Sequence, residues 1–303
     1  MNRITKFLPF MALAAGVLAI SWSAIFVRWT RMPGVASGFY RMLIAAAALC
    51  TILLARRVHH GAISRKMLLL AILGGVFFAT DIGCYNVAVL QTGAGSATFL
   101  GNNAPLIVGL FTWLLTRNLP SRSFWVALLL GSIGAWLIVY ADHIHAPART
   151  RGDLLATFAS VCFALYLLVT ERAREQMGTL TLVSLSTIAS TVVLFLFAIG
   201  TKTSLAIPSG SSLASLLGLG VVCQLAGYLC LTYALGHLPA TISSVVLLAV
   251  SPLTAVWAFL CFGEQMTPLQ WFGGCLILAA VWLAGKMKDR AGLRRAPTIQ
   301  IGE

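Results

Sequence analysis

Ten stretches of apolar residues follow one another along the chain, separated by short polar connections. A helix needs about 20 such residues to cross a bilayer, because each residue advances it by about 1.5 Å. The runs show none of the apolar–polar alternation of membrane β-barrel strands. We therefore expect an all-α transmembrane protein with ten spans, at residues 8–27, 34–55, 67–87, 93–115, 123–141, 153–170, 180–200, 212–235, 240–262 and 267–285.

The composition agrees with a chain whose main solvent is lipid. Hydrophobic residues make up 59% of the sequence and charged residues 10%, with a mean hydropathy of +0.92. A soluble domain carries about 25% charged residues, so this chain cannot cover a water-soluble surface. The first apolar run follows Arg3 and Lys6 and is long enough to span, which favours a retained first helix over a cleaved signal peptide.

The basic residues lie in the connections and the tail, and they predict the orientation of the chain. With alternating crossings, fifteen Lys and Arg residues fall on the side of the termini. Five fall on the other side: Arg28, Arg31, Arg149, Arg151 and Lys202. Cytoplasmic loops are enriched in Lys and Arg, so we expect a multi-pass protein of the cell membrane with both termini in the cytoplasm. The net charge of +13 therefore indicates orientation and not a nucleic-acid partner.

Two stretches of the sequence resemble each other. Residues 88–105 and 234–252 each leave one span, cross a connection of small residues and place a proline, Pro105 or Pro252, midway along the next span. A unit of five spans crosses the membrane an odd number of times, so a second copy enters from the opposite side. This predicts a 5+5 inverted repeat, typical of secondary transporters. We expect repeats at residues 1–141 and 142–285, and a basic tail at 286–303 that touches membrane lipid.

The order of these features resembles the drug/metabolite transporter superfamily, and within it the EamA-like proteins with ten helices. The motifs that carry the resemblance are Pro33 followed by Tyr40-Arg41, Ala164-Leu165-Tyr166 in the sixth span, the two mid-helix prolines, and Gly263-Glu264 after the second of them. The resemblance implies a central cavity between helices one to four and six to nine. It also implies transport of amino acids, metabolites, vitamins or drugs, often outward.

The sequence departs from the family pattern at two places. Thr116-Arg117 stands in the first half where the second has Gly263-Glu264. The first span has Ser21-Trp22-Ser23 where relatives often carry Gly and Asn after the tryptophan. If this part of the first span contacts the substrate, the specificity of relatives does not carry over to this chain.

Two charged residues lie inside spans, where ionisable groups are costly and often functional. Asp81 is either a contact for a substrate amine or a proton-coupling site, or a carboxylate that is neutralised by a structural partner or protonated outright. Arg41 either recognises an anionic substrate group, or forms a structural pair, or extends its side chain to the membrane interface. Counting from the span ends places both side chains about 10 Å below the outer surface, which predicts that they interact directly or through water.

Several polar and aromatic residues are further candidates to line a cavity. Asn102 and Asn103 precede Pro105, and a proline frees a backbone carbonyl in the preceding turn. Amides at such a break line a cavity or join neighbouring helices, and the sequence leaves both readings open. The other candidates, which are packing residues in the alternative reading, are Trp22, Tyr40, Tyr85, Tyr166, Gln224 and Tyr228.

The remaining chemistry is sparse. The seven cysteines lie in apolar runs without a CxxC pair, and the histidines lie in connections, so we expect no disulfide, no metal site and no cofactor. An intramembrane enzyme needs paired aspartates, a Ser with a His, or HExxH, and the spans lack these sets. A secondary carrier of a small solute is the favoured function, against a channel, an enzyme or a scaffold. Substrate, direction, coupling ion and the choice of monomer or homodimer stay open.

Overall fold

The computed structural model describes residues 3–55, 63–92, 94–101, 104–117, 121–143, 150–263 and 267–290. Within these ranges every regular element is a helix. The elements are α1 (Arg3–Ile20), α2 (Ser23–Thr30), α3 (Gly34–Ala55), α4 (Arg65–Thr92), α5 (Ala94–Gly101), α6 (Ala104–Thr116), α7 (Arg122–His143), α8 (Thr150–Arg174), α9 (Thr179–Gly200), α10 (Gly210–Leu217), η1 (Gly218–Gly227), α11 (Tyr228–Leu235), α12 (Ala240–Leu247), α13 (Val250–Phe262) and α14 (Pro268–Arg290).

These elements form ten apolar segments in the described part of the chain, as the hydrophobic pattern predicts. Seven are long and apolar enough to cross a membrane, and three shorter apolar helices lie at Ala104–Leu114, Arg122–Gly134 and Trp271–Leu283. Three of the long segments consist of consecutive elements: α1 with α2, α10 with η1 and α11, and α12 with α13.

The first span differs from the single helix expected at residues 8–27. It reaches from α1 to the end of α2 at Thr30 and is interrupted at Ser21 and Trp22. The Ser21 hydroxyl donates to the Leu18 carbonyl at 2.7 Å, and the Ser21 carbonyl accepts from Thr254 Oγ1 at 2.9 Å. Local polar groups therefore replace regular helix bonds at the break, which hydropathy alone does not reveal.

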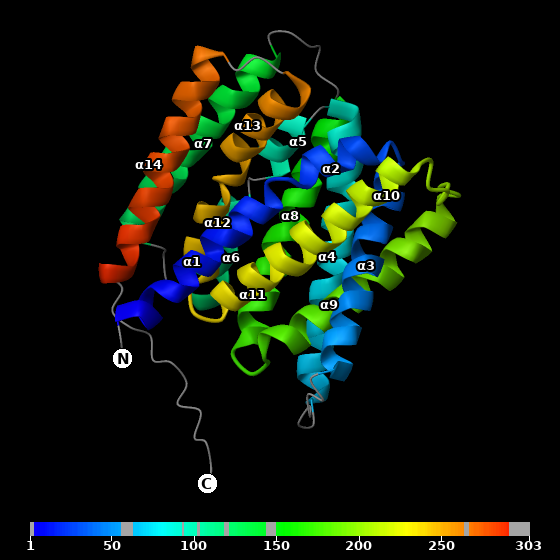
Figure 1. The fold of residues 1–303 in the computed structure, drawn as a ribbon. Coiled ribbons are helices and arrows are strands. Elements are labelled where there is room, and N and C mark those ends of the chain that lie inside the picture. The colour runs from blue at the N-terminus through cyan, green and yellow to red at the C-terminus, as the bar shows by residue number, and fades with distance from the viewer. Residues whose placement is uncertain are drawn as a thin grey trace.

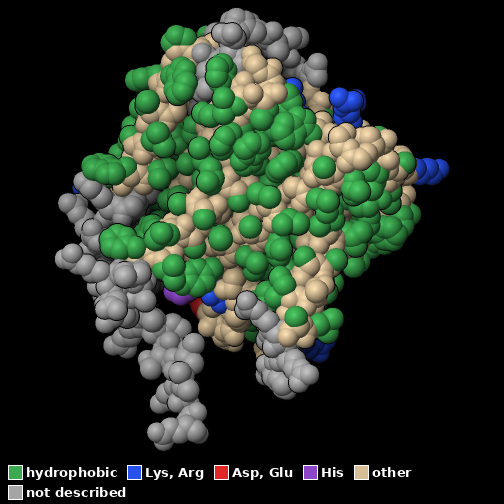
Figure 2. All heavy atoms as spheres, in the orientation of Figure 1, with side chains coloured by type: hydrophobic (Ala, Val, Ile, Leu, Met, Phe, Trp, Pro, Cys, Tyr) green, Lys and Arg blue, Asp and Glu red, His purple; other side chains and the backbone are tan. Residues whose placement is uncertain are grey.

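The outer surface is apolar in its middle and basic toward its ends. Figure 2 shows hydrophobic side chains spread over the face in view, with Lys and Arg side chains near the ends of the bundle. Leu54, Leu129, Leu154 and Leu260 are among the exposed large apolar residues, each more than 60% exposed. Such a surface suits lipid as the surrounding solvent.

The two halves of the chain pack as an inverted pair. Helix α5 contacts α13, and α6 contacts α12, so the helices of the fourth and ninth predicted spans lie antiparallel. Helix α7 packs along α14, which runs beside it in Figure 1. A Cβ on Gly134 would lie 2.4 Å from the Gly273 carbonyl oxygen, so glycine permits this close approach between α7 and α14. The start of α1 and the end of α14 lie at the same end of the bundle (Figure 1).

Candidate functional site

The polar centre of the bundle is built where irregular helices of the two halves meet. The break between α1 and α2 belongs to the first half, and the π-helix η1 belongs to the second. Such π-helical segments are rare and often occur at functional sites. A Cβ on Gly220 in η1 would lie 2.6 Å from Ile44 Cγ2 and 3.3 Å from the Arg41 carbonyl oxygen. Glycine at this position therefore lets η1 lie directly against α3.

Arg41 lies in this contact and is 1% exposed. Its Nε donates to Gln224 Oε1 at 3.1 Å, and its Nη1 donates to Ser23 Oγ at 2.8 Å. Both acceptors are neutral, so they orient the guanidinium without neutralising its charge. Its Nη2 is buried without a hydrogen-bond partner, and a buried unsatisfied donor costs about 1–3 kcal/mol or more when charged.

An aromatic cluster lies beside the guanidinium. Arg41 Cζ is 5.4 Å from the centroid of the Tyr228 ring, within the range of a cation–π interaction. Phe78 lies 4.5 Å from Tyr228 and 4.6 Å from Tyr166, measured between ring centroids. Helices α4, α8 and α11 each contribute one of these rings, so the cluster joins both halves next to Arg41.

Asp81 follows Phe78 by three residues and precedes Tyr85 by four, so the three side chains share one face of α4. The side chain is 7% exposed. Among the described residues, Asp81 has no hydrogen bond and no ion pair. It interacts electrostatically with Arg41, Tyr166 and Tyr228, so its charge lies near the same centre.

The sequence predicts that Arg41 and Asp81 interact directly or through water, because both lie at a similar depth in the membrane. The two charges lie within electrostatic range, but within the described part of the chain they form no direct ion pair. Arg41 turns instead toward Ser23 and Gln224. The direct form of the predicted interaction between Arg41 and Asp81 is therefore absent from the described residues. The water-mediated form stays a prediction.

Trp22 lies at the break in the first span and contacts the second half. Its ring stacks on Trp257 of α13 at 4.4 Å between centroids. The Trp257 indole Nε1 donates to Ser21 Oγ at 2.8 Å, and Thr254 donates to the Ser21 carbonyl at 2.9 Å. Three contacts from one turn of α13 therefore hold the interruption between α1 and α2.

Tyr40 and Tyr85 have structural partners away from the guanidinium. The Tyr40 hydroxyl donates to the Leu205 carbonyl at 2.9 Å in the connection between α9 and α10. The Tyr85 hydroxyl bonds with Thr98 Oγ1 in α5 at 2.9 Å. Each hydroxyl ties one helix to another segment, which supports the packing interpretation of these tyrosines.

The remaining candidates belong to the fourth and ninth spans predicted from the sequence. Asn102 and Asn103 lie outside the described residues. Pro105 is buried in the first turn of α6, where a proline fits because the first backbone N–H groups of a helix have no partner. Pro252 lies in the first turn of α13, and a Cβ on Gly274 in α14 would lie 3.6 Å from Pro252 Cβ. Each proline thus lies in the first turn of its helix.

Sequence reasoning missed several residues that build this centre. Ser23, Phe78 and Trp257 contact the candidates directly. Asn86 is fully buried and donates to the Gly34 carbonyl at 3.2 Å and to Ser37 Oγ at 3.1 Å. The sequence could have identified Asn86, because a polar amide inside an apolar span needs a hydrogen-bond partner. No sequence signal distinguishes Phe78 from the other apolar residues of α4.

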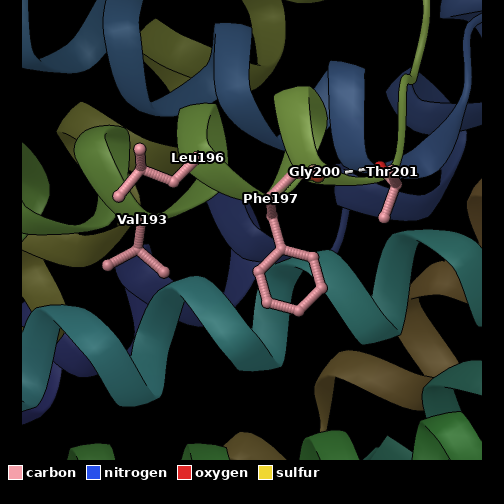
Figure 3. A pocket seen from close by; sticks show the side chains of 5 residues that line it. All are labelled: Val193, Leu196, Phe197, Gly200 and Thr201. Carbon is pink, nitrogen blue, oxygen red and sulfur yellow. Dashed lines mark hydrogen bonds between the residues drawn. The ribbon is translucent and has the colours of Figure 1, made fainter.

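A surface hollow on α9 has a different character. It has a volume of about 400 Å³ and is lined by Val193, Leu196, Phe197, Gly200 and Thr201. Figure 3 shows Val193 and Phe197 on the same side of the helix, as their spacing of four residues requires. Leu196 and Phe197 are more than half exposed, so the hollow faces the apolar exterior and offers no charged group to a polar solute.

The chemistry of the centre fits solute binding. Among the described residues there is no group of three or more His, Cys, Asp or Glu side chains that could hold a metal ion. The centre offers one guanidinium, one carboxylate, an amide and aromatic rings, contributed by both halves of an inverted helical bundle. This combination of fold and site defines the class of multi-pass membrane transporters.

Comparisons with known proteins give the family. The EamA-like transporter family matches residues 8–140 and 150–285, so the chain belongs to it. The uncharacterized transporter YwfM of Bacillus subtilis is 28% identical over 254 residues, covering 80% of this chain and 81% of that protein. The threonine/homoserine exporter RhtA of Salmonella typhimurium is 26% identical over 229 residues, covering 74% and 73% respectively. These relatives are named as transporters and not as enzymes.

A solved structure supports the fold independently. A crystal structure with 18% sequence identity superposes with a TM-score of 0.78 over 94% of this chain and 99% of its own. The fold of this chain therefore agrees with that of a crystallised protein over nearly the whole length of both chains.

Proposed function

We propose that this protein is a secondary transporter that exports a small metabolite, amino acid or drug-like solute by alternating access. The observation that carries the proposal is the buried bond between Arg41 and Gln224, since it joins the two inverted halves at a charged side chain. A solute bound there touches both halves at once. Rocking of one half against the other would then expose that solute to one side of the membrane at a time.

The location follows from the charge distribution. We place the protein in the cell membrane with both termini in the cytoplasm, because fifteen basic residues lie on the side of the termini and five on the other. The outward direction is supported by the name of one relative, a threonine/homoserine exporter. Amino acids are therefore the first solutes to test.

A channel is the main alternative, because it too would fit a multi-pass helical bundle. The two mechanisms differ in counterflow. A carrier with an excess of unlabelled solute inside a vesicle concentrates labelled solute from outside, whereas a channel only equilibrates it.

The test is a counterflow assay in proteoliposomes loaded with a mixture of amino acids, nucleosides, vitamins and cationic drugs. We expect transient accumulation of at least one labelled solute above its external concentration, and none in protein-free vesicles. Equilibration without overshoot would favour a channel. Absence of any flux across the whole panel, with folded protein in the vesicles, would reject transport as the function.

A further inference from the structure

Arg41 and Asp81 are opposite charges enclosed in the membrane interior, yet they do not neutralise each other. Within the described residues no ion pair joins them, and Asp81 has no hydrogen bond. A purely structural pair would be expected to form direct bonds, because contact lowers the desolvation penalty of both charges. The two groups are instead held apart, although each lies within electrostatic range of the other.

The guanidinium is fixed in an orientation that leaves one of its nitrogens without a partner. Ser23 accepts from Nη1 and Gln224 accepts from Nε, while Nη2 is enclosed without a partner. An arginine can present two parallel N–H groups to a carboxylate, and this geometry makes it the preferred residue for carboxylate recognition. Nη2 with its two hydrogens is therefore the remaining attachment point for an anionic group.

The carboxylate of Asp81 offers the complementary contact. It keeps a small accessible surface and shares its helix face with Phe78, whose ring contacts Tyr166 and Tyr228. Tyr228 also lies under the guanidinium and interacts electrostatically with both charges. The aromatic cluster therefore reaches from the guanidinium to the face of α4 that carries Asp81, so an ammonium group bound by Asp81 would lie near aromatic rings.

We propose that Arg41 and Asp81 form a divided binding site for a zwitterion, with Arg41 holding the carboxylate and Asp81 the ammonium group of an α-amino acid. This inference rests on the proposed transport function and names the substrate class of the same site. A zwitterion satisfies both buried charges at once and carries no net charge itself. A solute with only one of the two groups leaves the other protein charge uncompensated in a low-dielectric interior.

Because Arg41 Nη2 is buried, the structure corresponds to a conformation in which the proposed site is closed to solute. Ser23 belongs to the first half, whereas Gln224 and Tyr228 belong to the second. Separation of the halves would break the Gln224 bond and withdraw the Tyr228 ring, which uncovers Arg41. The same groups that orient the guanidinium thus close over it.

The test uses full-length protein in proteoliposomes and needs no variant in its first stage. Counterflow with the twenty proteinogenic L-amino acids identifies the one exchanged best. Its methyl ester, which keeps only the ammonium group, and its N-acetyl derivative, which keeps only the carboxylate, then compete against it. We expect each derivative to compete at least tenfold less well than the parent amino acid. Equal competition by either derivative would overturn the proposal.

The second stage assigns each charge to its residue. Arg41→Gln should reduce the discrimination against the methyl ester, and Asp81→Asn should reduce the discrimination against the N-acetyl derivative. Arg28→Gln removes a different arginine, which lies over the Phe262 ring, and should keep both discriminations. A folded Arg41→Gln protein that still rejects the ester tenfold would contradict the assignment. If a variant does not fold, the first stage still decides the proposal.

Failure of this inference differs from failure of the proposed function. Counterflow of a nucleoside, vitamin or cationic drug without counterflow of any amino acid would reject the zwitterion site and keep the transporter. No counterflow of any solute would reject transport itself.

Discussion

Arg41 Nε in α3 donates to Gln224 Oε1 in η1 at 3.1 Å, a bond between residues that lie 183 positions apart in the chain. It joins the two halves of the molecule at a buried charge. The amide of Gln224 reaches this position because η1 is a π-helix that packs closely on α3 at Gly220. Several expected outcomes depend on this contact and on the others that join the halves.

Replacing Gln224 by Leu should destabilise the protein, because Arg41 Nε then loses its acceptor in a buried site. A hydrogen bond to a charged group contributes about 2 kcal/mol, so the thermal midpoint in detergent should fall by several degrees. Gln176 is exposed in the connection after α8, so Gln176→Leu is a matched control that should leave the midpoint unchanged. Equal midpoints for the two variants would contradict the importance of this bond.

Gln224→Glu should have a different effect from Gln224→Leu. The new carboxylate can pair with Arg41, so the protein should stay folded with an unchanged or higher thermal midpoint. Because the pair neutralises Arg41, counterflow activity should fall at least tenfold. Full activity of a folded Gln224→Glu protein would show that the Arg41 charge is not needed for transport.

Trp257→Phe should weaken the contact between α13 and the break in the first span. The substitution keeps an aromatic ring opposite Trp22 but removes the bond from the indole Nε1 to Ser21 Oγ, at a cost of about 1 kcal/mol. Thr254→Val removes the second bond to Ser21. Both bonds hold Ser21, so their contributions to stability should be coupled. The loss of stability in the double variant should therefore differ from the sum of the losses in the two single variants. Strictly additive changes in the thermal midpoint would argue that the two bonds act independently.

Gly134→Ala should separate α7 from α14, because the added methyl group would lie 2.4 Å from the Gly273 carbonyl oxygen. Overpacking of this kind costs about 1–3 kcal/mol, so the thermal midpoint should fall by several degrees. Gly200→Ala is the control, since no heavy atom lies within 4 Å of a Cβ at that position. A Gly134→Ala protein as stable as Gly200→Ala would contradict the packing of the two helices.

Tag accessibility in intact cells tests the orientation. An epitope tag inserted after Ala148 should be reached by an antibody from outside, and a tag after Glu303 only after permeabilisation. Lys202, which is exposed in the connection between α9 and α10, should react with a membrane-impermeant amine reagent from outside. The opposite pattern at these three positions would reverse the proposed topology.

The hydrophobic pattern by itself determined that the chain crosses a membrane in ten segments, because lipid requires long apolar helices whatever their neighbours are. It also revealed the duplication, since Pro105 and Pro252 recur at matching places in the two halves. The buried charges Arg41 and Asp81 could be selected as candidates because ionisable residues inside apolar spans are rare.

Only the tertiary structure decided how these residues are used. Lipid is as apolar as a protein core, so a membrane helix is hydrophobic all round and its sequence does not reveal which face turns inward. The depths of the two residues predicted an interaction between Arg41 and Asp81. In the structure, the rotation of α3 and the close approach of Gly220 let Arg41 bond with Ser23 and Gln224 instead. Rotation and close approach depend on side chains of other helices, which are distant in the sequence and adjacent only after folding.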